Sequence, residues 1–144
     1  MRAFSLTQPW ASAVALGIKQ RETRSWPTRF RGEVAIHASK AFPRWAREFA
    51  DLESCTHPEL DELPLGYIVA VCQLTECRQT ETLAPTLSEQ ELRWGDYSPG
   101  RYAFKLESVR LLEEPVFHRG ALSFWSVAWD ETNQILRQLK RKGS

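Results

Sequence analysis

One segment constrains the fold of this chain more than any other, the apolar run at residues 66–76, GYIVAVCQLTE. Its first half is apolar on both alternating faces, which is typical of a strand in the middle of a sheet. Such a strand needs neighbours, and the sequence offers four further strand candidates. They lie at residues 2–6, 32–39, 101–109 and 124–129. Period-two alternation is clearest at 32–39 and 101–109.

The helix signals are fewer and shorter than the strand signals. A helix predicted at 9–16 is apolar nearly all round and should be buried, with Trp10 in the core. Residues 44–52 form an amphipathic pattern, and Ser88 with Glu91 resembles a capping box. Asp130 would cap a last helix ending near residue 139, followed by a flexible basic tail at 140–144.

Strands and helices do not alternate regularly along the chain, which argues against a doubly wound fold. The expected class is α+β, a small mixed sheet or barrel with peripheral helices. The 144 residues, 42% hydrophobic and 26% charged, suit one globular domain spanning 1–144. No apolar run approaches the roughly 18 residues of a membrane span, and no secretory signal pattern is present, so a cytoplasmic protein is expected.

The cysteines and glycines indicate no cofactor. Three cysteines form no disulfide framework and have no metal-ligand spacing, so no metal site is predicted. The glycine patterns that cradle phosphates in dinucleotide-binding and P-loop proteins are missing from the sequence. The oligomeric state is not predicted.

The net charge of +1 is unevenly distributed. Residues 1–49 carry a net charge of +6, residues 50–100 carry −8, and residues 101–144 carry +3. A basic first third with interleaved aromatic residues suits a polyanion or nucleotide ligand. Neutralisation of one part by another across the fold explains the same distribution equally well.

The stretch GIKQRETRSW, residues 17–26, concentrates the candidate chemistry. Lys19 would bind phosphate, or act as a base if desolvated; the ordinary alternative is a solvated lysine after a helix end. Glu22 and Arg24 share a face if this stretch is extended, and then form an ion pair of structural or functional value. Trp26 would either stack on a base or pack in the core.

Several pieces in order resemble one known family. They are QPWA at 8–11, the spacing G-x-K-x-x-E-x-R from Gly17 to Arg24, RG at 31–32 and IHAS at 36–39. Later pieces are GYIVAVCQLTEC, GDYSPGRYAFKLE and GALSFW. Together they resemble the ASCH domain family, a branch of the PUA-like fold. The resemblance implies a PUA-like mixed β pseudo-barrel with flanking helices and a cleft beside the first helix.

The resemblance also implies a function. Family members are associated with RNA binding, so the leading prediction is an RNA- or nucleotide-binding protein that uses a basic cleft. The alternative is a hydrolase of acylated cytidine or RNA, with Lys19 as the key catalytic residue and Glu22 as its acidic partner. In the acylcytidine hydrolase branch, a threonine follows the matching lysine by three residues. Glu22 stands at that place here, with Thr23 beside it, and the branch's distal glutamate would be Glu89 or Glu91.

The remaining candidates lie on or near the predicted strands. In this family the strand at 32–39 borders the cleft, so His37 and Ser39 would face the ligand, although a lone strand histidine is more often structural. Arg31 and Lys40 would form part of a basic rim. Arg101 lies opposite the core face of the strand at 101–109 and would reach the cleft. The predicted ligand-binding residues are Lys19, Glu22, Arg24, Trp26, Arg31, His37, Ser39, Lys40 and Arg101.

Overall fold

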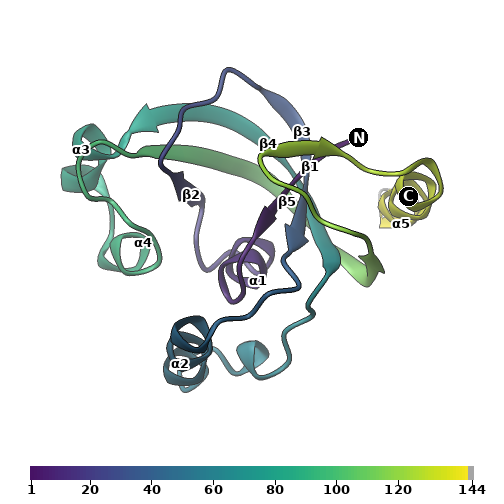
Figure 1. Cartoon of the computed structure of the whole chain (residues 1–144), viewed down its shortest axis with the longest axis horizontal. Helices are drawn as coiled ribbons and strands as arrows, with labels where there is room; N and C mark the ends of the chain where they lie inside the picture. Colours follow the sequence, from purple (N-terminus) through teal and green to yellow (C-terminus); the bar gives the residue numbers. More distant parts are fainter. Residues whose placement is uncertain (143–144) are drawn as a thin grey trace.

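The structure of the protein is a computed structural model that describes residues 1–142. Within this range the chain forms a mixed sheet and five α-helices (Figure 1). In chain order the elements are β1 (Arg2–Leu6), α1 (Trp10–Ala15), β2 (Arg21–Arg24), β3 (Gly32–Ala38), α2 (Arg44–Glu53), a 3₁₀ turn (Pro58–Asp61), β4 (Tyr67–Gln79), α3 (Thr80–Leu83), a 3₁₀ turn (Ala84–Thr86), α4 (Glu89–Arg93), β5 (Tyr102–Phe117), β6 (Phe124–Ser126) and α5 (Trp129–Lys142).

The sheet has six strands in the order β2-β5-β4-β3-β1-β6, so the apolar segment forms an interior strand, β4, as predicted. Only the β1–β3 pair is parallel among the pairs of residues 1–142. The sheet is curled. Phe124 lies on edge strand β6 and Phe104 on β5, next to the opposite edge, yet their rings stack with centroids 6.3 Å apart. Figure 1 shows the strands bending around α1. This architecture confirms the predicted α+β, PUA-like pseudo-barrel.

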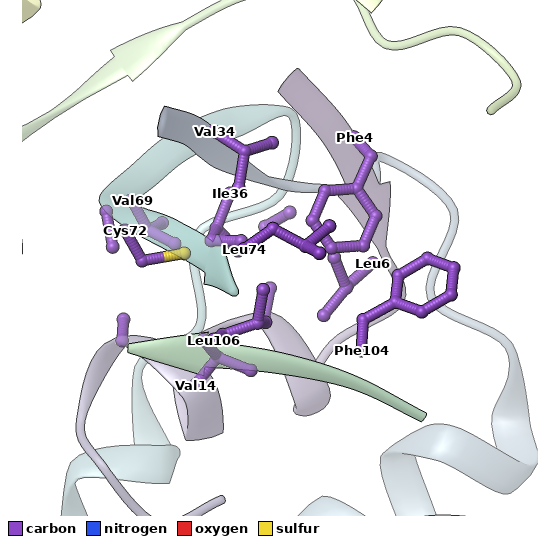
Figure 2. Packing of buried hydrophobic residues seen from close by; sticks show 14 residues of the cluster. Phe4, Leu6, Val14, Val34, Ile36, Val69, Cys72, Leu74, Phe104 and Leu106 are labelled. Carbon is purple, nitrogen blue, oxygen red and sulfur yellow. The ribbon is translucent and has the colours of Figure 1, made fainter. Parts of the chain in front are cut away.

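The two faces of the sheet have separate cores. On the concave side, Val14 of α1 packs with alternate residues of the strands, including Phe4 and Ile36 (Figure 2). On the other side, Ile135 of α5 packs with residues such as Ala35, one position along from Ile36. The alternation predicted for β3 is therefore confirmed, and each face carries a different helix.

Some predicted boundaries were wrong. Residues 21–24 form strand β2, which the sequence suggested only as a charged stretch, because Glu22 and its neighbours pair with 102–105 of β5. Strand β5 continues to Phe117 rather than 109, since β4 pairs with it as far as that residue. At the end of α1, Leu16 is exposed instead of buried.

The C-terminal helix is longer than predicted. It begins at Trp129, so Asp130 lies in its first turn and is not the residue before it. It extends through Lys142, and therefore three residues of the predicted basic tail are helical; the last two, 143 and 144, lie outside the described residues. None of the helices formed by residues 1–142 has the length and apolar character to cross a membrane.

Candidate functional site

A cavity of about 610 Å³ opens beside α1, where strands β1 and β2 meet helices α2 and α4. Its volume lies within the range typical of small-ligand sites. Four cationic side chains, two carboxylates and four large aromatic rings contribute to the lining. The lining residues are Ser5, Thr7, Trp10, Lys19, Glu22, Thr23, Arg24, Trp45, Phe49, Arg93, Trp94, Gly95, Asp96 and Arg101.

Lys19 is buried, with 1% of its surface exposed, so it is not the solvated lysine that its position after a helix would suggest. Gly17, at a φ of +79°, ends α1 and turns the chain inward. The Lys19 ammonium donates to Glu22 Oε1 at 3.0 Å and to the Trp94 carbonyl at 2.9 Å. An ammonium has three N–H groups, so these two hydrogen bonds leave one of them unused.

Glu22 lies between two cations. Its Oε1 meets Lys19, and its Oε2 lies 3.3 Å from Nη2 of Arg24. Residues 21–24 are extended, which places Glu22 and Arg24 on one face as expected for this spacing. Arg24 Nη2 also donates to the Ser5 carbonyl at 2.6 Å, and its guanidinium lies over the Phe4 ring. The carboxylate therefore orders both cations.

Helix α4 fixes the segment that carries Lys19. The backbone N–H of Gln20 donates to Glu91 Oε1, and Gln90 Nε2 donates to the Ile18 carbonyl at 2.6 Å. Ser88 caps the helix as predicted, accepting from the Glu91 N–H at 3.2 Å. The Glu91 carboxylate is thus directed at Gln20. Neither Glu91 nor Glu89 lines the cavity.

The outer part of the cavity is held by two further ion pairs. Arg93 pairs with the buried Glu53 of α2, which connects α4 to α2. Arg101 Nε lies 3.4 Å from Asp96 Oδ2. Hydrogen bonds from Ser98 hold the pKa of Asp96 below its ordinary value, and Arg101 adds to this effect, so Asp96 is ionised at neutral pH.

Four aromatic side chains that line the cavity, Trp10, Trp45, Phe49 and Trp94, contact one another and form an aromatic wall. Trp10 stacks on Phe49 at 5.1 Å and contacts Trp45 at 5.5 Å. Trp10 packs against the core, as the sequence favoured, and it also lines the cavity. Trp26 lies outside the lining and packs edge-on against Phe104 at 5.3 Å.

The other predicted ligand-binding residues divide into two groups. Lys19, Glu22, Arg24 and Arg101 all meet at the cavity, whereas Arg31, His37, Ser39 and Lys40 do not line it. Arg31 donates to the carbonyls of Thr28 and Phe30 in its own exposed loop.

His37 is buried and bonded away from the cavity. Its Nε2 donates to the His118 carbonyl at 2.8 Å, which leaves Nδ1 to accept from Ser5 Oγ at 2.9 Å. Burial lowers its pKa below the ordinary value, so the ring is neutral at pH 7. These contacts give His37 a structural role.

Comparison with known families decides the identity of the fold. The family model of the ASCH domain matches residues 4–119. The chain belongs to the ASCH domain family. ASCH domains are generally associated with RNA binding. No curated protein matches the chain.

Solved structures agree with this assignment. The crystal structure of the ASCH protein from Zymomonas mobilis has a TM-score of 0.59 and 19% identity, covering 94% of this chain and 93% of that one. A single-residue variant of the same protein gives a TM-score of 0.58 at 19% identity, covering 94% of this chain and 96% of that one. At this identity the similarity establishes the fold.

Several residues of this ASCH domain's cavity were not predicted from the sequence. They are Trp45, Phe49, Arg93, Trp94 and Asp96, together with Ser5, Thr7, Thr23 and Gly95. The amphipathic pattern at 44–52 was a usable signal, because Trp45 and Phe49 are four residues apart and share a helix face. No local pattern connects Trp94 with Lys19. Among residues 1–142, no group of three histidine, cysteine or acidic side chains could hold a metal ion.

Proposed function

We propose that the cavity beside α1 binds one nucleotide of an RNA chain, or a free nucleotide. The observation that carries this proposal is the combination of an aromatic wall with four cations in one cavity of nucleotide size. Aromatic side chains stack on bases with little sequence preference, and arginine and lysine bind phosphate. The association of ASCH domains with RNA supports the same ligand class.

The aromatic rings and the cations of the cavity would have different tasks. Trp45 is 62% exposed at the cavity, so its ring is available to a base. The ammonium of Lys19 and the guanidinium of Arg24 share the single carboxylate of Glu22, which leaves an excess of positive charge for a phosphate. Arg93 has a largely exposed side chain beside the same cavity and would approach a second phosphate.

The test compares two exposed tryptophans. Trp45→Ala removes part of the aromatic wall, whereas Trp129→Ala removes a tryptophan that is 77% exposed on α5 and does not line the cavity. Trp45→Ala should weaken binding of short RNA or mononucleotides by about 5- to 150-fold, the equivalent of about 1–3 kcal/mol of stacking. Trp129→Ala should leave it unchanged. Calorimetric titration at low salt measures both, and equal affinities for the two variants would refute the proposal.

A second candidate function is hydrolysis of RNA or acylated cytidine. The observation that favours it is the buried Lys19–Glu22 pair at the cavity. A proton can pass between an ammonium and a carboxylate in contact, so the pair could act in general acid–base catalysis. Glu22 replaces the threonine of the hydrolase branch, and the Thr23 hydroxyl accepts from the Asp96 N–H at 3.0 Å. Both features favour binding over that reaction. Product formation from RNA or N4-acetylcytidine, abolished in Lys19→Ala, would establish the catalytic alternative.

A further inference from the structure

A second groove lies on the other side of the sheet from α1. It has a volume of about 570 Å³ and is formed by α5 and by Glu114 of β5. Helix α5 packs through Ile135 and Leu139 on the core opposite α1, and Figure 1 shows it apart from α1, α2 and α4. The groove, called here the α5 groove, is lined by Glu114, Gln134, Arg137, Gln138, Lys140 and Arg141.

Two cations of the α5 groove, Arg137 and Lys140, differ from those of the cavity because they lack a carboxylate partner in the described part of the chain. All four cations that line the cavity lie within ion-pair distance of a carboxylate. Arg137 and Lys140 are exposed, and neither forms an ion pair with any of residues 1–142. Their charges are therefore available to a ligand without the cost of breaking an internal pair.

The helix that presents these charges is firmly attached. Gln138 is buried, donates to the Glu114 carbonyl at 2.8 Å and accepts from the Glu114 N–H at 3.1 Å. Arg137 and Lys140 are three residues apart and so lie on neighbouring positions of one face. The helix dipole favours cations near a helix C-terminus and could explain why they occur there. It does not explain why they line a groove in which Glu114 is the single carboxylate.

We propose that the α5 groove binds the phosphate backbone of RNA at a distance from the nucleotide in the cavity. The ligand class rests on the proposed function, whereas the site itself rests on the unpaired side chains of Arg137 and Lys140. A groove with several cations can bind several successive phosphates. Each contact between a cation and a phosphate releases counterions from the RNA, and an arginine can donate two hydrogen bonds to one phosphate. The cavity would then bind one nucleotide, and α5 would add affinity that grows with RNA length.

The test uses RNA oligonucleotides of about 4 and about 16 nucleotides, the usual limits of a single-strand site. The variant R137Q/K140Q removes the two unpaired charges and keeps good helix formers. The control R29Q/R78Q removes two exposed charges that line neither site. For long RNA, R137Q/K140Q should reduce the slope of log affinity against log salt by about 1.4, whereas the control should leave it unchanged. Short RNA should bind all three proteins equally.

Each other outcome has a defined meaning. If both double variants reduce the slope equally, the attraction is diffuse and the α5 groove is not a site. If short RNA binds but long RNA binds no more tightly, the proposal for α5 fails while the proposed function stands. If short RNA does not bind but long RNA depends on Arg137 and Lys140, the proposed function fails and the α5 groove remains. Absence of binding at either length overturns both.

Discussion

The ammonium of Lys19 donates a hydrogen bond at 2.9 Å to the backbone carbonyl of Trp94, 75 residues further along the chain. This bond joins the turn after α1 to the residue that ends α4. The same helix also holds the neighbouring backbone through Glu91 and Gln90. The lysine at the centre of the site is therefore positioned by contacts between distant parts of the sequence.

Lys19→Met should destabilise the fold by about 3 kcal/mol. The substitution leaves the Trp94 carbonyl without its donor and Glu22 with Arg24 alone, and breaking a buried ion pair typically costs about 3–5 kcal/mol. Urea denaturation measures the free energy of unfolding. The control is Lys105→Met, which breaks a partly exposed pair with Glu107 at 3.1 Å and should cost less than about 1 kcal/mol. Similar losses in the two variants would contradict a buried structural pair at Lys19.

Glu91→Ala should weaken both stability and nucleotide binding. It removes the acceptor of the Gln20 N–H, at a cost of about 1–3 kcal/mol, and frees the segment that carries Lys19. Ser88→Ala removes the cap of the same helix, at a cost of about 1 kcal/mol, and keeps the Gln20 contact. Urea denaturation and nucleotide titration should therefore separate the variants: both lose stability, and only Glu91→Ala loses affinity. Equal affinities would show that the contact does not position Lys19.

The stability of the protein should fall as the pH drops below about 6.5, in part because of His37. Burial lowers the pKa of this ring below its ordinary value of 6.5, so the unfolded state binds a proton before the folded state does. The contribution is complete above pH 6.5 and is lost as the pH falls toward the folded pKa. The groups that face the ring are Ser5, Gly66, His118, Gly120 and Trp125.

Two measurements check this dependence. Urea denaturation at about pH 7.5 and about pH 5.5 should show a loss of stability in the wild type that is smaller in His37→Gln. An NMR titration of the His37 ring should give a pKa below 6.5. A ring that titrates above that value would show that the folded state favours the charged form, contrary to the burial of His37.

Most of the fold was predictable because its signals are local. Successive residues of a strand face opposite sides of the sheet, so a short run of residues shows which sides are buried. This signal predicted β4 from its apolar run and β3 from the alternation of Val34, Ala35 and Ile36. The prediction failed where pairing decided the structure. Strand β2 has a charged sequence, and it is a strand because β5 lies beside it. The extension of β5 to Phe117 likewise depends on the length of β4.

The candidate site was only partly predictable. Glu22 and Arg24 are two residues apart in an extended strand, so their spacing was enough to bring them together, whereas Lys19 reaches Glu22 from a turn that α4 holds in place. The aromatic wall comes from α1, α2 and the end of α4, and no pattern in one segment indicates what the others supply. The sequence did not predict that Trp10 lines the cavity as well as packing against the core, or which of its two expected places Trp26 takes, because each tryptophan's surroundings come from distant elements.

The membership in the ASCH family, the α+β class and the local ion pairing of Glu22 could be inferred from the sequence alone, because these depend on residue order and short spacings. The burial of Lys19 beside a cavity, and the position of the unpaired Arg137 and Lys140 beside a groove, follow from the tertiary structure alone. Burial and pairing are properties of the space around a side chain. That space is enclosed by residues far away in the chain.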